Sequence, residues 1–475
     1  MTDHTEDLKD LFFRTFDQKV ERFGLLEASG SNRKYYRMQA GTTSVIGAYN
    51  IDFKENTAFI AFTNHFLKKN IAVPAIYVEN LEKNIYLLDD LGYETLYSYL
   101  CRLRNNSEHF PQAAIPLYKQ ALDGLLEMQL SGNEEFDYSL CYPRNTFDEQ
   151  SIAWDLNYFK YYFLKLARIP FDENRLEDDF QTLTRFLLEA DNSFFLYRDF
   201  QSRNIMLHKN KLYFIDYQGG RKGALQYDVA SLLYDAKADI PQAVREELLN
   251  YYIAQLHKKL PKQAASFKKY YDAFVLIRIM QAMGTYGFRG FYERKPHFLQ
   301  SIPYALKNLE YLLAHTQIPV EIPHLWTVLP QLVYAEALQQ YAKPALTVTI
   351  NSFSFKNSYP VDNEENGGGF VFDCRCLPNP GRQQQYSSLT GKDAPVIDFL
   401  EKEEAVKQYF EQARQLIDMA IKNYTERGFE NLSVSFGCTG GRHRSVYFAE
   451  KMQKYINQTY AVNTRLHHLM EKTFS

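Results

Sequence analysis

The first 90 residues combine strand-like and helix-like spacing of apolar side chains. Apolar residues recur every three to four positions around Leu8–Phe16 and over Thr57–Asn70, which predicts two helices. Polar and apolar residues alternate in three further segments, which predicts strands because successive side chains of a strand face opposite sides of its sheet. These segments are 34–39, 44–49 and 84–88. Residues 1–90 are therefore expected to form a small mixed lobe.

Helical spacing prevails over residues 91–320, which we expect to form a second, larger lobe. A short strand-rich insert, Leu196–Ile215, interrupts the helices and holds the densest group of polar residues in this half. The predicted helices are Ile115–Gln129, Trp154–Leu166, Leu176–Glu189, Ala243–Leu256 and Ala273–Met283.

The pattern changes again after residue 320. Prolines punctuate residues 321–343, which predicts a connector with one helix near Pro330–Tyr341. Residues 344–475 then mix both periodicities, as a compact α/β domain would. The predicted strands are Ala345–Phe353, Phe370–Cys374 and Leu432–Phe436, and the predicted helices are Ala405–Tyr424 and Ser445–Gln458.

Composition narrows the class of protein. The 475 residues are 45% hydrophobic and 23% charged, with a formal net charge of −3, which is typical of a globular protein and argues against a nucleic-acid coat protein. Five cysteines are few and odd in number, which fits a reducing compartment. The acidic N-terminus lacks the layout of a signal peptide, and no run of apolar residues suits a membrane span. We therefore expect a cytoplasmic protein without a membrane partner.

The polar insert carries the parts that phosphoryl transfer requires. Asp199 is followed after four residues by Asn204, and a strand-like segment then ends at Asp216. In kinases one carboxylate accepts or orients the proton of the acceptor hydroxyl, while an amide oxygen and a second carboxylate hold Mg²⁺ on the nucleotide phosphates. Oxygen ligands suit this hard cation. The spacing predicts Asp199 as the base and Asn204 and Asp216 as metal ligands.

Residues 1–320 resemble the aminoglycoside phosphotransferase family, and most closely its bacterial anomeric sugar kinases, which act on N-acetylmuramate and N-acetylglucosamine. The resemblance rests on Ser31-x-Arg33-x-Tyr35-x-Arg37, Leu88-Asp-Asp-Leu-Gly92, Tyr197-Arg-Asp-Phe-Gln-Ser-Arg-Asn-Ile-Met206, Ile215-Asp-Tyr-Gln-Gly-Gly220 and Tyr227-Asp-Val-Ala-Ser-Leu-Leu233. It implies a two-lobed protein-kinase-like fold with lobes at 1–90 and 91–320, and it implies ATP and Mg²⁺ as cofactors. It also implies nucleotide-binding residues at Ser31, Arg33, Arg37, Asp89 and Leu91, and support of the active-site loops by Arg198 and Asp228.

Two departures from that family matter. Tyr197 stands where the family has a histidine before Arg-Asp, and the strand Val45–Tyr49 has no lysine to pair with the phosphates. Arg33 or Arg37 is expected to supply the missing charge. The second departure leaves open a protein that binds nucleotide without catalysis.

A second constellation lies near the C-terminal end of the sequence. Gly437-Cys-Thr-Gly-Gly-Arg-His-Arg444 separates a predicted strand from a predicted helix. Glycines allow backbone N–H groups to turn inward, the helix N-terminus favours an anion, and Arg444 offers a forked charged partner, so the loop suits a phosphate. The spacing from Cys438 to Arg444 also matches cysteine-dependent phosphatases, for which Asp373 is the nearest candidate proton donor.

Residues 346–472 resemble the C-terminal domain of the RNase adapter protein RapZ family. The matching strings are Ser352-Phe-Ser-Phe-Lys356, Val371-Phe-Asp-Cys-Arg-Cys-Leu-Pro-Asn-Pro380, Leu389-Thr-Gly-Lys-Asp-Ala-Pro-Val396 and Gly437-Cys-Thr-Gly-Gly-Arg-His-Arg-Ser-Val-Tyr447. The resemblance implies that a phosphosugar such as glucosamine-6-phosphate binds at Asp373, Arg375, Cys438, Thr439, Gly440, Gly441, His443 and Arg444.

This resemblance also has departures. Gly381 replaces a family histidine, which puts the sugar specificity in question. Residues 344–475 hold 15 lysines and arginines against 15 aspartates and glutamates, a balance that argues against RNA binding.

The sequence as a whole predicts an α/β multidomain protein, with a two-lobed kinase-like fold followed by a compact α/β phosphosugar-binding domain. The predicted function is an ATP- and Mg²⁺-dependent kinase for an amino sugar of cell-wall recycling, fused to a phosphosugar sensor. Three alternatives stay open: a choline or aminoglycoside kinase, a non-catalytic adapter that binds nucleotide and regulates RNA or protein partners, and a phosphatase at Cys438.

Overall fold

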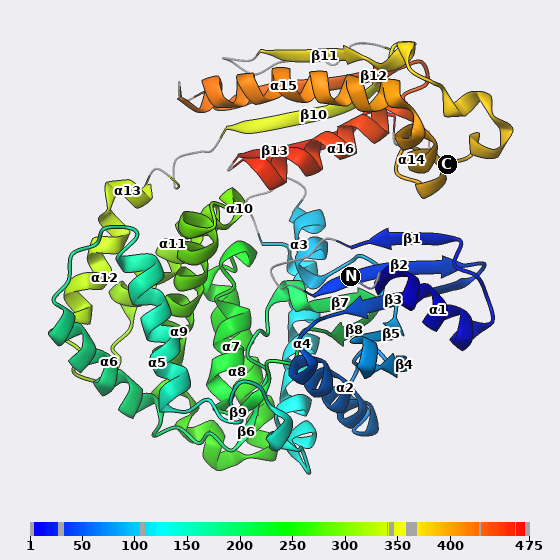
Figure 1. Cartoon of the computed structure of the whole chain (residues 1–475). Coiled ribbons are helices and arrows are strands. Elements are labelled where there is room, and N and C mark those ends of the chain that lie inside the picture. Colours follow the sequence, from blue (N-terminus) through cyan, green and yellow to red (C-terminus); the bar gives the residue numbers. More distant parts are fainter. Residues whose placement is uncertain are drawn as a thin grey trace. The chain divides into compact units, whose positions relative to one another are not determined.

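The computed structural model describes residues 4–26, 33–104, 110–339, 341, 346–357, 368–426, 429–460 and 462–470. Two compact units make up the chain (Figure 1). The N-terminal unit comprises residues 1–164, 169–284 and 304–331, and the C-terminal unit comprises 165–168, 285–303 and 332–475. Among the helices within the described ranges, none is both long and apolar enough to cross a bilayer.

A five-stranded antiparallel sheet, in the order β1-β2-β3-β5-β4, begins the N-terminal unit. The strands are β1 (Arg22–Leu25), β2 (Lys34–Ala40), β3 (Thr43–Tyr49), β4 (Ile76–Asn80) and β5 (Ile85–Asp89). The three strands expected from alternation are β2, β3 and β5, whereas β1 and β4 lie at the two edges of the sheet and were not predicted. Edge strands are short or half-exposed here, so their apolar pattern is weak.

Two helices cover this sheet, and the alternation in β5 explains how. Ile85 and Leu87 join the core cluster that includes Leu8 and Phe12 of α1 (His4–Phe16). Tyr86, which points the other way, stacks on Phe59 of α2 (Phe53–Lys68) with 5.3 Å between ring centroids. Both faces of β5 are therefore buried, and α2 is held against the sheet (Figure 1).

Helices dominate residues 96–339. They are α3 (Leu96–Arg104), α4 (Ile115–Gln129), α5 (Glu149–Phe159), α6 (Glu173–Leu187), α7 (Leu225–Leu233), α8 (Gln242–Lys259), α9 (Pro261–Tyr286), α10 (Pro296–Leu299), α11 (Ile302–His315), α12 (Leu325–Tyr334) and α13 (Glu336–Gln339). The predicted helices are present with shifted ends. The segment expected over Trp154–Leu166 leaves the α-helical form at Phe159 and continues as a π-helical turn, Lys160–Leu164.

The helix expected near Pro330–Tyr341 is the clearest error. The sequence predicts a helix that starts at Pro330, whereas α12 begins at Leu325 and contains Pro330. Burial outweighs the lost backbone hydrogen bond, because Leu325, Val328, Leu329 and Leu332 are fully buried along one apolar face.

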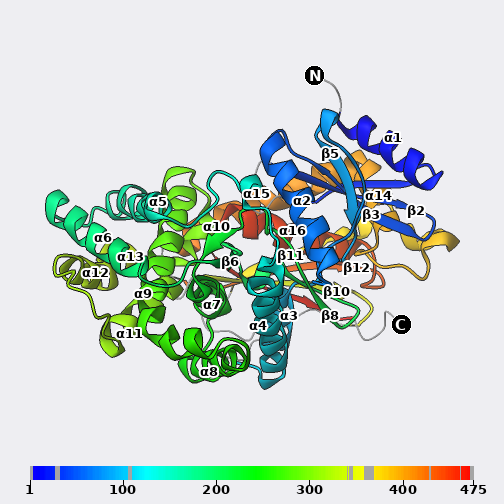
Figure 2. The ribbon, with the colours of Figure 1, turned by 90° about the horizontal axis from the view of Figure 1, so that it is seen from below.

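Two short antiparallel pairs of strands lie between α6 and α7 in the sequence. The strand β6 (Phe194–Leu196) pairs with β9 (Arg221–Gly223), and β7 (Ile205–His208) pairs with β8 (Lys211–Phe214). In Figure 2, β6 lies beside α4 and α7, which it contacts. The polar residues of the insert thus occupy loops that a helical core supports.

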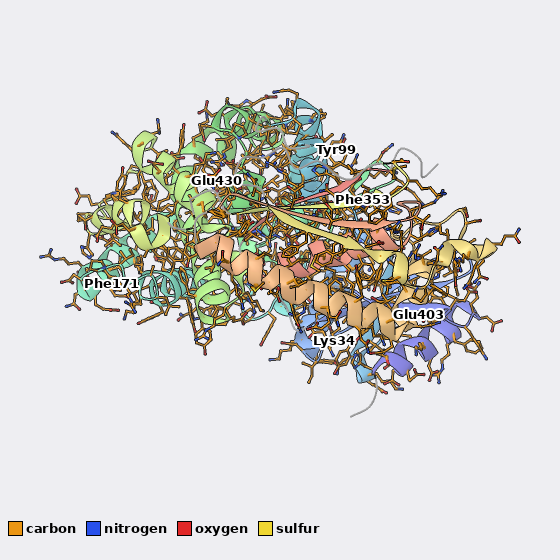
Figure 3. All side chains as sticks on the ribbon, turned by 90° about the horizontal axis from the view of Figure 1, so that it is seen from above. Lys34, Tyr99, Phe171, Phe353, Glu403 and Glu430 are labelled. Carbon is orange, nitrogen blue, oxygen red and sulfur yellow. The ribbon has the colours of Figure 1, made fainter. Side chains whose placement is uncertain are left out.

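The C-terminal unit contains a parallel four-stranded sheet in the order β11-β12-β10-β13. Its strands are β10 (Thr347–Ser354), β11 (Gly369–Asp373), β12 (Asn431–Cys438) and β13 (Asn463–His468), and its helices include α14 (Ala394–Lys402), α15 (Glu404–Glu426) and α16 (Arg444–Thr459). Glu403 and Glu430, both labelled in Figure 3, mark the residues just before α15 and β12. Because the strands are parallel, Ser354, Asp373, Cys438 and His468 gather at one edge.

Gly391 offers a test of how tightly this edge is packed. A Cβ at this position would lie 2.2 Å from the backbone oxygen of His443 and 2.4 Å from the backbone nitrogen of Tyr447. Gly391→Ala should therefore destabilise the C-terminal unit by about 1–3 kcal/mol, as overpacking usually does. Gly440→Ala is the matched control, because no atom lies within 4 Å of its added Cβ. Thermal unfolding of both variants checks this, and equal stability would contradict the described packing.

Candidate functional site

The loop of residues 197–204, which holds Asp199, is anchored by one buried carboxylate. Asp228 of α7 is fully buried and accepts the backbone N–H of Tyr197 at 2.7 Å and that of Arg198 at 3.0 Å. Arg198 has φ +84°, an unfavourable value for a side-chain-bearing residue, so the two bonds hold the loop in a shape it would not adopt alone. Burial raises the pKa of Asp228 to about 7, although both backbone bonds act against that rise.

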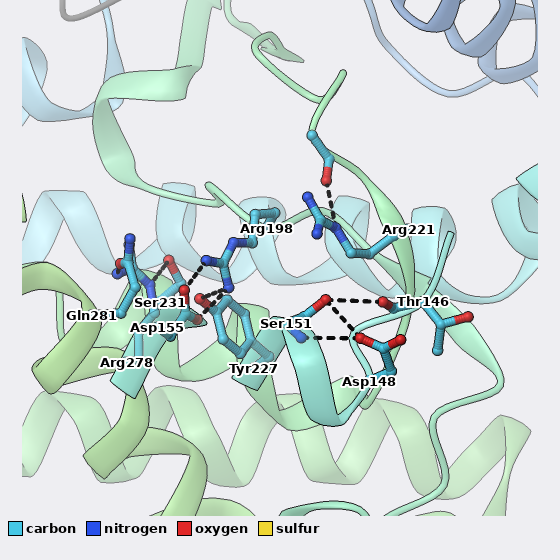
Figure 4. Close-up of polar contacts among 11 residues, drawn as sticks. Thr146, Asp148, Ser151, Asp155, Arg198, Arg221, Tyr227, Ser231, Arg278 and Gln281 are labelled. Carbon is cyan, nitrogen blue, oxygen red and sulfur yellow. Dashed lines mark hydrogen bonds and ion pairs between the residues drawn. The ribbon is translucent and has the colours of Figure 1, made fainter. Parts of the chain in front are cut away.

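The side chain of Arg198 fastens the same loop to two helices. Its guanidinium forms a two-pronged ion pair with Asp155 of α5, at 2.7 and 2.5 Å, and donates to the hydroxyl of Tyr227 of α7 at 2.5 Å (Figure 4). Bidentate pairs of this kind fix orientation as well as charge. The predicted supporting roles of Arg198 and Asp228 thus have a direct geometric basis.

Tyr197 explains one departure from the kinase pattern. Its ring is fully buried, and its hydroxyl donates a hydrogen bond to the backbone carbonyl of Ile215, the residue before Asp216. The phenol therefore ties the loop that carries Asp199 to the strand end that carries Asp216.

The three residues that the spacing singled out come together. The Asn204 side-chain N–H₂ donates to the backbone oxygen of Asp199 at 2.9 Å and to Oδ2 of Asp216 at 3.3 Å. Among the bonds described, this leaves the amide oxygen of Asn204 available to a cation. Asp216 has φ +70°, which turns the chain sharply at the end of the β7–β8 hairpin.

The charge at this site suits a divalent cation. Burial, together with the neighbouring charge of Asp199, raises the pKa of Asp216. A bound cation would remove this penalty, and a carboxylate with an amide oxygen is the donor set that Mg²⁺ prefers. The residues present therefore fit the ion that the sequence predicts.

The charge of Arg33 acts on Asp216, and a chain of contacts that the sequence did not reveal connects the two residues. It is 2% exposed and pairs with Glu55 of α2 at 3.3 Å. Gln218 then bridges the two centres, donating to Glu55 at 3.4 Å and to Asp216 at 2.8 Å. Protein kinases place a lysine–glutamate pair at the corresponding step, and here the arginine comes from the start of β2 instead of the next strand. Glu55 and Gln218 gave no motif because their partners are distant in sequence.

Arg37, the other arginine considered for the phosphates, lies elsewhere. It forms two 2.7 Å bonds with Asp90 and donates to the backbone oxygen of Gly92 at 2.8 Å. Ser44 adds a 2.5 Å bond to the same carboxylate. Arg37 therefore braces the segment between the sheet and the helical part, and Arg33 is the arginine whose position suits a phosphate.

The remaining predicted nucleotide contacts are of two kinds. The side chain of Asp89 accepts hydrogen bonds from the backbone N–H of Ala75 at 2.9 Å and from the hydroxyl of Tyr77 at 2.6 Å, and its own backbone N–H donates to the backbone oxygen of Ala75 at 2.9 Å. The carbonyl of Leu91 lies 3.1 Å from Nδ1 of His208. Ser31 lies outside the described residues.

The loop between β12 and α16 has the predicted strand–turn–helix form. Gly441 has φ +68°, and Thr439 and Gly440 are exposed. Arg444, at the start of α16, is 3% exposed and donates to the backbone oxygens of Arg375 at 3.0 Å and Leu377 at 2.8 Å. Within the described ranges its Nε has no hydrogen-bond partner. A buried donor in that state is costly unless an anion binds it.

The other residues predicted for this loop also lie close to it. Asp373 and Arg375 form an ion pair at 2.6 Å, and that pair lowers the pKa of Asp373. His443 lies 2.9 Å from the backbone oxygen of Tyr386, and burial lowers its pKa. Gly381 faces the His443 ring, 3.2 Å from where a Cβ would stand, so a larger residue there would crowd this ring.

The same geometry argues against phosphatase chemistry. Cys438 is only 3% exposed, which limits the access of a phosphate ester to its sulfur. Because the arginine pair keeps Asp373 ionised at neutral pH, it is a poor proton donor.

Asp228 gives the N-terminal unit a specific pH dependence. Its folded pKa of about 7 lies above the ordinary value of 3.8, so the unfolded chain releases this proton first. The stability that the protonated group contributes is complete below pH about 4 and is lost as the pH rises through about 7, at up to about 1.4 kcal/mol per pH unit. Asp228→Asn should lack this component. Denaturant unfolding of both proteins between pH 4 and 8 measures it, and parallel curves would contradict the prediction.

Two parts of the sequence match known protein families. The model of the phosphotransferase enzyme family matches residues 25–264, and that of the RapZ C-terminal domain matches residues 346–470. A nucleotide-binding protein of Thioalkalivibrio sulfidiphilus is 37% identical over 133 residues, which is 28% of this chain and 45% of the relative. One from Fervidobacterium nodosum is 40% identical over 126 residues, 26% of this chain and 43% of the relative. The chain thus spans less than half the length of these curated relatives.

Solved structures of kinases are also similar. A choline kinase from Streptococcus pneumoniae aligns with a TM-score of 0.44 at 12% identity, covering 66% of this chain and all of that one. A choline kinase from Cryptosporidium parvum aligns with a TM-score of 0.46 at 12% identity, covering 68% and 99%. Since the family model spans half of the sequence and contains Asp199, Asn204, Asp216 and Asp228, the chain belongs to the phosphotransferase enzyme family, and it carries a RapZ C-terminal domain.

Proposed function

We propose that the protein is an ATP- and Mg²⁺-dependent kinase for an amino sugar of cell-wall recycling, of the N-acetylmuramate or N-acetylglucosamine type. The observation that carries the proposal is the convergence of Asp199, Asn204 and Asp216, tied together by the amide of Asn204 at 2.9 and 3.3 Å. Membership of the phosphotransferase family supports the reaction class. The choice of sugar rests on the resemblance of the sequence motifs.

Each residue has a defined part in this proposal. Asp199 accepts or orients the proton of the acceptor hydroxyl, so that its oxygen is ready to attack. Asn204 and Asp216 hold Mg²⁺, which supplies the positive charge that neutralises the nucleotide phosphates. Arg33, positioned by Glu55, adds a permanent positive charge beside Asp216. The backbone of residues 89–91 contacts the nucleotide base.

For the RapZ C-terminal domain we propose phosphosugar binding without hydrolysis. The buried Arg444, with its unpaired Nε, is the observation that favours it. The nearby exposed backbone of Thr439 and Gly440 and the N-terminus of the 16-residue α16 provide further anion-binding groups. We propose no RNA partner, because the charges of this region balance. The proposed location is the cytoplasm.

The proposed base is tested by Asp199→Asn. Losing a general base should lower kcat about 10²–10⁴-fold, whereas ATP affinity should change little because the nucleotide is held by other residues. Turnover of Mg-ATP with N-acetylmuramate and N-acetylglucosamine measures the first effect, and equilibrium binding of ATP measures the second. Asp191→Asn is a matched control at an exposed turn before β6.

Two results would remove the kinase proposal. One is undiminished turnover in a folded Asp199→Asn protein. The other is ATP binding that is equal with and without Mg²⁺, with no acceptor phosphorylated, which would indicate the non-catalytic adapter.

The proposed sensor is tested by two variants of its loop. Arg444→Ala should weaken glucosamine-6-phosphate binding by about 2–3 kcal/mol, the range for a lost charge-assisted hydrogen bond. Cys438→Ser should keep most of the affinity, because a hydroxyl replaces a thiol of similar size. Calorimetry measures both, alongside an assay for phosphate release. Release that depends on Cys438 would establish the phosphatase instead.

A further inference from the structure

One cation near the catalytic loop lacks a counter-ion. Arg221 is the first residue of β9, five positions after Asp216, and only 7% of it is exposed. Its Nε donates to the backbone oxygen of Gly219 at 3.1 Å (Figure 4). Within the described parts of the chain, no carboxylate comes within the 4.0 Å of an ion pair with it, and its two terminal nitrogens form no hydrogen bond.

The charges around Arg221 make the lack of a counter-ion more unfavourable. Arg198 lies close enough to repel it, and the carboxylate of Asp155 is already held by Arg198 in two bonds. Burial and the charge of Arg198 lower the pKa of Arg221 to about 10, so it is still a cation at neutral pH. Asp199 also attracts it, but from beyond ion-pair distance.

A third arginine adds to the same positive region. Arg278 of α9 donates to the hydroxyl of Ser231 at 3.0 Å and to the side-chain oxygen of Gln281 (Figure 4). Both partners are neutral. Three guanidinium groups are thus accompanied by the carboxylates of Asp155 and Asp199, together with Asp228, which is partly protonated at neutral pH.

The aromatic rings in this region already contact arginine side chains of the protein. The guanidinium of Arg198 lies 5.2 Å from the ring centroids of both Phe147 and Tyr227, and that of Arg278 lies 5.9 Å from Tyr227. Recognition of quaternary ammonium groups depends on open aromatic faces and on surrounding negative charge. Here guanidinium groups lie over the rings of Phe147 and Tyr227, so these faces are not open to a quaternary ammonium group.

We propose that Arg221 binds an anionic group of the acceptor, so that the enzyme phosphorylates an acidic sugar in preference to a neutral one and excludes cationic acceptors. This inference rests on the proposed kinase function. Arg221 lies five residues after Asp216, and the charges of Arg198, Asp155 and Asp199 all act on it. A carboxylate or a phosphate on the acceptor would complete the missing ion pair.

The test uses the full-length protein with Mg-ATP and four acceptors. N-acetylglucosamine is the neutral probe, N-acetylmuramate carries a carboxylate on the same ring, N-acetylglucosamine 6-phosphate carries a phosphate, and choline is the cation. We expect a kcat/KM at least about tenfold higher for one anionic sugar than for the neutral one. Which of the two anionic sugars is preferred identifies the anionic group.

Variants of Arg221 separate substrate binding from a structural role. Arg221→Gln should lower kcat/KM for the preferred anionic sugar about 10–100-fold, the equivalent of one charge-assisted hydrogen bond, and for the neutral sugar less than about threefold. Arg221→Lys should restore part of the preference by restoring the charge. Arg185→Gln, on the exposed face of α6, is the matched control.

The outcomes distinguish failure of the inference from failure of the proposed function. Turnover without preference for an anionic sugar, or an equal loss for both sugars in Arg221→Gln, would overturn the inference and leave the kinase intact. If no acceptor is phosphorylated, the proposed function fails, and calorimetry of acceptor binding then decides the inference by the same comparison. Efficient turnover of choline would overturn the inference in favour of a cationic acceptor.

Discussion

A single buried carboxylate determines the shape of the catalytic centre. Asp228 receives two consecutive backbone N–H groups, and this fixes the loop in which Arg198 has a positive φ. Arg198 then reaches Asp155, Tyr197 reaches the carbonyl before Asp216, and Asn204 reaches the backbone of Asp199. The positive φ of Arg198 is unfavourable for a residue with a side chain, so the two bonds to Asp228 stabilise a conformation that the loop would not hold unaided.

Arg33 takes the position that we propose for the positive charge beside the phosphates. The ion pair with the helix residue Glu55 is made by Arg33, from the beginning of β2, and Gln218 passes the connection on to Asp216. An arginine is permanently charged and longer, so it can reach this position from a different strand.

The two constellations have a common physical principle. In each, a buried arginine is left with hydrogen-bonding capacity that the described protein groups do not fill: Arg221 beside the catalytic loop and Arg444 beneath the C-terminal loop. Folded proteins seldom leave such groups unsatisfied, because their desolvation is unfavourable. Both are proposed here as contacts for a negatively charged group, which an acidic amino sugar and a phosphosugar each carry.

The sequence by itself determined the periodic elements and the local motifs. Residues close along the chain, such as Asp199 and Asn204 or Gly437–Arg444, kept the relation that their spacing implied, since a short loop allows few alternatives. Tertiary structure alone decided the rest. Packing of elements distant in sequence places Glu55, Asp155 and Gln218 at the candidate site. The same packing pairs Arg37 with Asp90, so Arg37 is not available to the phosphates. Pro330 lies within α12 because burial of an apolar face outweighed its local preference, a balance that no short segment contains.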